Sequence, residues 1–384
     1  MKELNTPAQF QQAGDNPQAP VRIMLIVPMH ITFESFVNPP PNTRSYLKQD
    51  GHHYNLPPTD LPLGMLSISG YLKKHVAVDI KLVDFNIRVA EIDRFDHDNF
   101  CDFAEEELRK VDFQPDIVGI SSLFSPSFYN FIETGKAVRK VFPRALTIGG
   151  GNIPTSAWRD IYDSDNAWIF DALCYGEGEL PMLELVRATD RQAYIAESRS
   201  WITQAKAEQF FTPEHNFIED LDEIPFFDYD LCDVDKHNAN LVVTSFATSK
   251  NNRSFHVMTS RGCPFKCTFC ASHAVHGRDM RYHSVGRMRE DFTRLKDNYG
   301  AGTLIFQDDH FMADKERVRQ ILAILGELEL NSIYQSGLAL YALDRPMLED
   351  FYAAGVRQLV LAVESGSQRV LKHLMKKPLK LEIS

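Results

Sequence analysis

The stretch Arg261-Gly262-Cys263-Pro264-Phe265-Lys266-Cys267-Thr268-Phe269-Cys270 gathers three of the chain's six cysteines into one short segment. Three residues separate the first two cysteines and two residues separate the last two. Glycine and proline near the start of the stretch favour an irregular loop, and such a loop can turn three sulfur atoms toward one point. The spacing therefore predicts a soft-metal site with Cys263, Cys267 and Cys270 as ligands and a fourth partner from elsewhere.

Two kinds of metal site and one metal-free state are compatible with these cysteines. Structural zinc is usually closed by four Cys or His ligands, and His273 or His276 can supply the fourth, although no second cysteine pair follows. Iron-sulfur clusters are held by thiolates at close loop spacings, and three cysteines on a four-iron cluster leave one iron open for chemistry. The third possibility is that the cysteines are reduced and unliganded.

The cysteine spacing, with the aromatic Phe269 directly before the last cysteine, resembles the signature of the radical S-adenosylmethionine (SAM) superfamily. The resemblance implies a 4Fe-4S cluster on Cys263, Cys267 and Cys270, whose open iron is chelated by the amino and carboxylate groups of SAM. It also implies reductive cleavage of SAM to a 5'-deoxyadenosyl radical, chemistry that the cofactor supplies while the protein binds and orients it. By the same resemblance, the backbone beside Phe269 is expected to contact the adenine.

Composition places the chain among cytoplasmic globular proteins of two or three domains. Its 384 residues are 44% hydrophobic and 24% charged, as in ordinary folded domains. The net charge of -11 disfavours nucleic acid as a partner, because phosphate backbones select basic surfaces. Cysteines clustered in a chain of this length do not resemble a secreted disulfide framework. Neither a secretory signal nor an apolar run of about 18 residues occurs, so no membrane span is expected.

The first half of the chain alternates between strand and helix patterns. Residues 1–20 are polar and rich in Gln, Asn and Pro, which predicts a disordered leader. Residues 29–60 are expected to form a long loop. The predicted strands are 21–28, 78–84, 116–121, 145–151 and 172–179, the last two ending in a loop or turn, and the predicted helices are 61–74, 98–110, 128–141 and 180–188. Over residues 21–189 this alternation predicts an α/β domain with a doubly wound, Rossmann-like parallel sheet.

Several small or polar residues follow the predicted strands at their carboxyl ends, where ligands bind in such sheets. Glycine there permits close approach of the backbone to a ligand, although each glycine is also compatible with a simple tight turn. Together with the helix that begins at Pro62-Leu63-Gly64, these loops resemble the cobalamin-binding domain that precedes the radical SAM barrel in one large subgroup. The candidate cofactor-binding residues are Ser121, Gly149, Gly150, Gly151, Gly176 and Glu177.

One motif of that resemblance is incomplete. Cobalamin domains of the mutase type carry an Asp-x-His-x-x-Gly motif whose histidine replaces the lower axial base. Asp50-Gly51-His52 matches its first half, but Asn55 stands where the glycine belongs. Cobalamin therefore remains a possible cofactor that would bind without a histidine from this motif, and His52 is equally compatible with a solvated loop side chain.

The second half repeats the alternation after a connector. Residues 190–253 are expected to be a linker, and residues 254–384 a partial (β/α) TIM-like radical SAM barrel. Its predicted strands are 254–260, 302–309, 332–338 and 358–367, and its predicted helices are 284–298, 315–328, 344–354 and 367–377. The resemblance implies six strand-helix units, so four units predict either a truncated barrel or an open edge covered by a partner.

Acidic residues lie at two of these strand ends. Asp308 and Asp309 follow the second strand, and the resemblance assigns residues there to the SAM amine. Glu364-Ser365-Gly366 resembles the family element that contacts the ribose and carboxylate side of SAM. Each carboxylate is also compatible with a helix N-cap or a turn.

Three functions follow from these alternatives. The first is a radical SAM enzyme that transfers a methyl group to an unactivated carbon with cobalamin, or performs a related radical transformation. The second is a truncated, non-catalytic protein that binds cobalamin or the cluster, and the third is a structural zinc module. The expected partners of the enzyme are a small-molecule or peptide substrate and an electron donor such as flavodoxin or ferredoxin.

Overall fold

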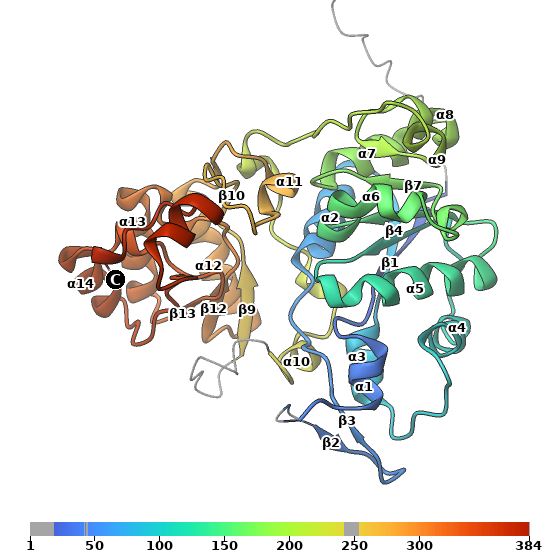
Figure 1. Ribbon diagram of the computed structural model, residues 1–384, viewed down its shortest axis with the longest axis horizontal. Coiled ribbons are helices and arrows are strands. Elements are labelled where there is room, and N and C mark those ends of the chain that lie inside the picture. Colours follow the sequence, from blue (N-terminus) through green and yellow to red (C-terminus); the bar gives the residue numbers. More distant parts are fainter. Residues whose placement is uncertain (1–18, 42, 44, 242–252, 384) are drawn as a thin grey trace, which may run out of the picture.

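The computed structural model describes residues 19–383 except residues 42, 44 and 242–252. Figure 1 shows two lobes, the first coloured blue to green and the second orange to red, joined by a connector. The predicted leader lies almost entirely outside the described residues. Among the helices that are described, none is long and apolar enough to cross a membrane.

The first lobe is built on a six-stranded sheet with the order β4-β1-β5-β6-β7-β8. Its strands are β1 (Val21–Val27), β4 (Val78–Asp84), β5 (Ile117–Ser121), β6 (Leu146–Gly150), β7 (Ala172–Cys174) and β8 (Trp201–Ile202). The first five are parallel to one another, which confirms the predicted parallel sheet. β8 pairs antiparallel with β7, so the start of the predicted 190–253 linker belongs to the sheet instead.

Helices cover both faces of this sheet. They are α2 (Leu63–His75), α3 (Phe85–Glu91), α4 (Phe100–Arg109), α5 (Phe128–Val141), α6 (Asn152–Tyr162), α7 (Glu179–Arg187) and α8 (Arg191–Glu197). Side chains alternate across a strand: Met24 and Ile26 pack into a core with α4 and α5, whereas Ile23 and Leu25 pack into another core with α2 and α7. Burial on both faces explains why β1 is apolar from Ile23 to Val27, and it confirms the doubly wound fold.

Two stretches carry more structure than their sequence patterns indicated. The expected 29–60 loop contains α1 (Phe33–Val37) and a short hairpin of β2 (Tyr46–Leu47) with β3 (His53–Tyr54). The connector contains α9 (Gln204–Ala207), two 3-10 turns (Leu221–Glu223 and Tyr229–Leu231) and α10 (Val234–His237). Tyr229 is buried in the core of the second lobe, and its hydroxyl donates to the carbonyl oxygen of His256 at 2.7 Å.

The second lobe holds three parallel strands in the order β13-β12-β9. They are β9 (Ser254–Val257), β12 (Thr303–Phe306) and β13 (Asn331–Tyr334), and the helices α12 (Val285–Tyr299), α13 (Lys315–Glu327) and α14 (Arg345–Ala353) follow them in turn. A small antiparallel pair, β10 (Ser260–Arg261) with β11 (Arg281–Tyr282), flanks the helix α11 (Ser272–His276). The predicted strand-helix order is confirmed for these three units.

The predicted fourth strand, 358–367, is wrong. Only one bridge forms among the described residues of this segment, between Leu338 and Leu361, whose side chain is 42% exposed. The backbone then folds on itself, because Val363 and Ser365 donate to carbonyl groups only two residues earlier. Glu364 has a φ of 69°, a left-handed conformation that ends an extended run. A short π-helix, Val370–Leu374, follows within the predicted helix 367–377.

Candidate functional site

The cysteine loop runs from β10 to α11 and is fixed by backbone contacts on both sides. Gly262 has a φ of 93°, and a Cβ there would lie 2.3 Å from the carbonyl oxygen of Asp279, so only glycine fits. The N–H of Cys263 donates to the carbonyl oxygen of Gly277 at 3.3 Å. Thr268 donates from its N–H to Met375 at 2.9 Å and from its hydroxyl to Leu374 at 2.8 Å. These contacts hold the loop between β11 and the π-helix.

The three cysteines of the loop are free thiols of intermediate exposure. Burial raises the pKa of Cys263, and the charges of Asp309, Cys270 and Cys267 raise it further, so these groups are neighbours. Within the described ranges, no three His, Cys, Asp or Glu side chains are gathered closely enough to hold a metal ion. The donor set is nevertheless chemically suited to iron and sulfide, because it offers three soft sulfur ligands on one irregular loop.

The zinc alternative needs a histidine beside these thiols. His276 instead directs its Nδ1 to the Glu177 carboxylate at 2.8 Å, in the seam between the lobes. His273 lies on the wall of the cavity described below, which Cys270 also lines, but among the described residues it does not form a group of three ligands with the thiols. A closed site of three cysteines and one histidine is therefore not formed by the residues that the structure describes.

Asp308 and Asp309 are neighbours in sequence but differ in environment. Asp308 is buried and accepts hydrogen bonds from the Thr259 and Ser260 hydroxyls, both at 2.6 Å, and from the Thr259 N–H. Burial raises the pKa of Asp308, and these hydrogen bonds only partly oppose the rise. The carboxylate of Asp308 thus ties the end of β9 to the end of β12, beneath the cysteine loop.

Asp309 carries a buried carboxylate oxygen, Oδ2, that has no hydrogen-bond partner among the described residues. The ring of the next residue, His310, shares a hydrogen bond with the Tyr341 hydroxyl at 2.7 Å and lies 5.2 Å from the ring of Phe265 in the cysteine loop. A buried carboxylate oxygen normally has a donor, since desolvation without one is costly. Asp309 is therefore suited to receive a cationic or N–H group of a ligand.

Phe269 and Glu364 both lie beside Lys377. The Phe269 ring is 50% exposed and lies 5.8 Å from the Lys377 ammonium nitrogen, which also pairs with the Glu364 carboxylate at 3.1 Å. Burial raises the pKa of Cys267, the Lys377 charge opposes this, and Glu364 adds a small rise. The structure thus brings two further predicted residues to the edge of the cysteine loop.

A cavity of about 700 Å³ separates the cysteine loop from the first lobe. Thr268, Phe269 and Cys270 form part of one wall, and Thr155 and Tyr175 form part of the other. This volume lies within the range of about 300–1,000 Å³ that is usual for small-molecule sites. His273, considered above as a zinc ligand, also lines it, and three further wall residues were not predicted from the sequence: Trp158, Arg159 and Phe211.

The candidate residues at the ends of β5 and β6 lie close together. Ser121 and Gly150 are paired in register, and a Cβ on Gly151, whose φ is 94°, would lie 2.6 Å from the Ser122 carbonyl oxygen. A Cβ on Gly149 would meet Leu173 and Phe131 at 2.7 Å, so Gly149 serves helix-sheet packing. A Cβ on Gly150 would have only ordinary contacts, the nearest at 3.8 Å.

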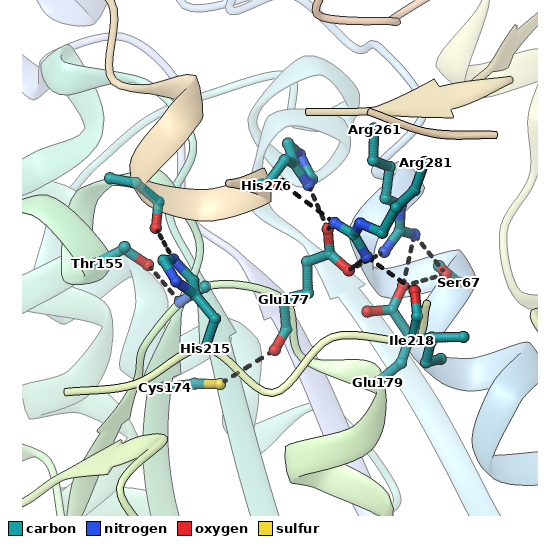
Figure 2. Close-up of polar contacts among 12 residues, drawn as sticks. Ser67, Thr155, Cys174, Glu177, Glu179, His215, Ile218, Arg261, His276 and Arg281 are labelled. Carbon is teal, nitrogen blue, oxygen red and sulfur yellow. Dashed lines mark hydrogen bonds and ion pairs between the residues drawn. The ribbon is translucent and has the colours of Figure 1, made fainter. Parts of the chain in front are cut away.

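Gly176 and Glu177 lie in the seam between the lobes. A Cβ on Gly176 would lie 2.7 Å from the His215 ring and 3.2 Å from the Val275 carbonyl oxygen of α11. Figure 2 shows the Glu177 carboxylate facing Arg261, Arg281 and His276. It accepts from Arg261 at 2.8 Å and from both terminal nitrogens of Arg281 at 2.5 and 3.1 Å.

A second carboxylate completes this group, which we call the Glu177 cluster: Glu177, Glu179, Arg261, Arg281 and His276. Glu179 accepts from Arg261 at 2.7 Å and from the Ser67 hydroxyl at 2.5 Å. Burial alone would raise the pKa of Glu177, but the Arg261 charge and the hydrogen bonds from His276 and Arg281 outweigh it and hold that pKa well below its usual range. Glu177 therefore remains ionised while only 3% of its side chain is exposed.

Two family models match the chain, one in each lobe. The model of the B12 binding domain matches residues 59–186, and the model of the radical SAM superfamily matches residues 257–382. The chain is 30% identical over 360 residues to cytidylyl-2-hydroxyethylphosphonate methyltransferase of Streptomyces wedmorensis, a match that covers 86% of this chain and 66% of that protein.

Two further proteins are similar to the chain. The anaerobic magnesium-protoporphyrin IX monomethyl ester cyclase of Rubrivivax gelatinosus is 25% identical over 320 residues, or 80% of this chain and 52% of that protein. The solved structure of the cobalamin-dependent SAM radical enzyme OxsB, with aqua-cobalamin and SAM bound, has a TM-score of 0.66 at 16% identity and covers 95% of this chain and 46% of that one. The chain spans about half to two thirds of the length of these proteins.

Proposed function

The chain belongs to the subgroup of the radical SAM superfamily that carries a B12-binding domain, and from this premise we propose that it is a cobalamin-dependent radical SAM methyltransferase. The reaction would transfer a methyl group to an unactivated carbon of a small-molecule or peptide substrate. Support for methyl transfer comes from the Streptomyces wedmorensis relative, which is a methyltransferase by name.

The observation that carries this proposal is the cavity between the lobes. Its walls come from the two regions that the family models match, with Cys270 and Phe269 on one side and Thr155 and Tyr175 on the other. A methyl relay between two cofactors needs them to face each other across one shared space, since reacting atoms must approach to about 3–3.5 Å. The cavity provides such a space.

On the second lobe, we assign the cluster to Cys263, Cys267 and Cys270. When bound, the cluster and SAM supply a one-electron cleavage that produces the 5'-deoxyadenosyl radical. The free Oδ2 of Asp309 would accept from the SAM amine, because it is a buried acceptor without a donor in the described part of the chain. The half-exposed Phe269 would lie against the adenine, and Glu364 would lie on the ribose side.

Asp308 receives a different role from the one that its sequence position suggested. Its donors are Thr259 and Ser260, and Arg317 lies near enough to lower its pKa. We propose that Asp308 holds the end of β9, and thereby the root of the cysteine loop, while Asp309 contacts SAM.

On the first lobe, we assign cobalamin to the strand-end loops of the sheet. Gly150 leaves open space at its Cα, and Ser121 and Gly151 lie beside it. Gly176 adjoins Tyr175, which lines the cavity. In the β2–β3 hairpin the Asp50 carboxylate accepts from the Tyr54 hydroxyl at 2.7 Å, so the half-motif Asp50-Gly51-His52 has a local role. We therefore propose that cobalamin binds without a histidine from this motif.

The proposed reductant is a flavodoxin or ferredoxin in the cytoplasm. These donors are acidic proteins, and exposed cations lie next to the cysteine loop although the chain as a whole has a net charge of -11. Lys266 belongs to the loop itself, and Lys372 and Lys376 lie on or beside the π-helix that contacts it. Electrostatic complementarity of this kind raises association rates.

Detection of 5'-deoxyadenosine tests the proposed activity. The anaerobically reconstituted chain, reduced with dithionite in the presence of SAM, should form 5'-deoxyadenosine, and the Asp309→Ala variant should form much less at the same iron content. A chain that binds iron and yields no 5'-deoxyadenosine would instead be a binding protein. Zinc in place of iron would establish a structural zinc module.

A further inference from the structure

The Glu177 cluster connects the two lobes at the root of the cysteine loop (Figure 2). Glu177 belongs to the loop after β7, whereas Arg261 lies on β10, His276 ends α11 and Arg281 lies on β11. One carboxylate thus holds the residue at which the cysteine loop begins, the end of the helix that follows the loop, and the next strand. The start of the loop and the end of the helix that follows it are thus fixed to one carboxylate of the other lobe.

The two arginines make this carboxylate necessary. Arg261 and Arg281 face each other directly in the antiparallel pair of β10 and β11. Like charges in directly opposed positions destabilise a strand pair. Their side chains are each 5% exposed, so water cannot screen the repulsion, and the counter-charge comes from Glu177 and Glu179 of the first lobe.

Displacement of Arg261 would be transmitted to the thiols. Cys263 follows Arg261 by two residues, and consecutive Cα atoms are fixed about 3.8 Å apart. Gly262 lies between them at a close approach to another part of the chain, because a Cβ there would lie 2.3 Å from the Asp279 carbonyl oxygen. The position of Arg261 therefore determines where Cys263 enters the loop.

On the other side, Glu177 is fixed to the cavity wall of the first lobe. Gly176 donates from its N–H to the Thr155 hydroxyl at 3.2 Å, and the Glu177 carbonyl oxygen accepts from the Cys174 thiol at 3.7 Å. Thr155 and Tyr175, the residue before Gly176, both line the cavity. One residue thus links the wall that we assign to cobalamin with the loop that we assign to the cluster.

We infer that Glu177 is a positioning residue that sets where the cysteine loop lies relative to the strand-end loops of the B12-binding domain. The inference deepens the proposed function and rests on it, because the relative placement of the two loops matters for a reaction across the cavity. A second contact, from His215 Nε2 to the Ala274 carbonyl oxygen at 2.7 Å, carries no buried charge and holds only α11. Glu177 contacts the end of α11 as well, and in addition Arg261 at the start of the loop and Arg281 on β11.

Hydrogen exchange of the full chain tests this inference without any cofactor. Glu177→Gln keeps the side-chain shape and removes the charge, and Glu177→Asp keeps the charge on a shorter side chain. The matched control is Asp171→Asn, which breaks a pair with Arg139 at 3.0 Å inside the first lobe. Amides of residues 259–283 should exchange at least tenfold faster in Glu177→Gln, less so in Glu177→Asp, and at the original rate in Asp171→Asn.

Three results would overturn the inference. They are unchanged exchange of residues 259–283 in Glu177→Gln, an increase spread equally over α5 and α13, and a Glu177→Asp variant that exchanges as fast as Glu177→Gln. If Glu177→Gln does not fold, Arg281→Lys replaces it and should give a smaller increase in the same segment. Failure of the chain to bind iron would reject the proposed function and leave the exchange result standing.

Discussion

The Glu177 cluster and the cysteine loop adjoin the same strand pair, β10 with β11, and differ in their physical character. In the cluster, two carboxylates face two guanidinium groups and one imidazole, and the Glu177 and Arg261 side chains are 3% and 5% exposed. In the loop, three thiols of intermediate exposure lie beside a cavity, and Asp309 keeps a buried oxygen without a partner in the described chain. The satisfied region provides rigidity, and the unsatisfied region provides ligands.

The largest expected effect is a loss of stability caused by a substitution in the Glu177 cluster. Glu177→Ala would leave the buried Arg281 without a carboxylate and Arg261 with Glu179 alone, and removal of one partner from a buried pair typically costs about 3–5 kcal/mol. The free energy of unfolding, measured with urea, should fall by that amount. Lys315→Ala, which breaks an exposed pair with Asp344 at 2.7 Å, is the control and should change stability little. Equal losses in both variants would contradict the expected difference between the buried and the exposed ion pairs.

Substitution of the two neighbouring aspartates compares a carboxylate that has hydrogen-bond donors, Asp308, with one that has an oxygen without a donor among the described residues, Asp309. Asp308→Ala removes the acceptor for Thr259 and Ser260, so unfolding should become easier by about 1–3 kcal/mol. Asp309→Ala removes an oxygen for which the described residues supply no donor, so stability should stay constant or rise slightly. SAM affinity, measured by equilibrium dialysis of the reconstituted chain, should fall in Asp309→Ala. A stability loss confined to Asp309→Ala would reverse the assignment.

A pH titration of stability tests the environment of His283, a buried residue that directly follows β11. Burial lowers the pKa of His283 from 6.5 to about 3, and the charges of Arg287 and Arg261 contribute to the shift. Since the folded pKa lies below the unfolded one, stability is complete above pH 6.5 and falls as the pH drops below it. Linkage predicts a loss of about 1 kcal/mol between about pH 7.5 and pH 5.5. The loss should disappear in His283→Gln, and an unchanged pH slope in that variant would contradict the assignment.

The smallest effect on stability is expected at the exposed cations beside the loop. The double variant Lys372→Glu with Lys376→Glu should unfold at the original urea concentration. Its turnover with reduced flavodoxin should fall several-fold at low salt, whereas turnover with dithionite should stay the same, because dithionite needs no docking surface. The control pair is Lys81→Glu with Arg144→Glu, two exposed cations of the first lobe. A parallel loss with both reductants would place the defect elsewhere.

Sequence patterns were sufficient for most of the fold, and they single out the cysteine loop as the candidate site. β1 is apolar at consecutive positions because both of its faces are covered, and the three cysteines are unusual in spacing wherever they fold. The pairing of Glu177 with Arg261 was not predictable, since 84 residues separate them and no local pattern links them. Glu177 was therefore predicted from its glycine-rich loop as a cofactor contact rather than as a seam residue.

Two other differences between the sequence-based expectations and the structure also have local causes. Asp308 and Asp309 are chemically identical, and only the direction of the chain at the end of β12 decides which one faces Thr259. The segment 358–367 has the apolar composition of a strand, but the left-handed Glu364 and the exposed Leu361 leave it with one bridge among the described residues. Strand composition alone does not provide a partner to pair with.

Iron and sulfide analysis of the anaerobically reconstituted chain tests most directly whether the cysteine loop holds an iron-sulfur cluster. The account predicts about four irons and four sulfides per chain, with absorbance near 400 nm. Cys267→Ala should lose most of both, while Cys174→Ala, which removes a buried thiol outside the loop, should retain them. Iron binding that is equal in wild type and Cys267→Ala, or a wild-type chain that takes up zinc and no iron, would contradict it.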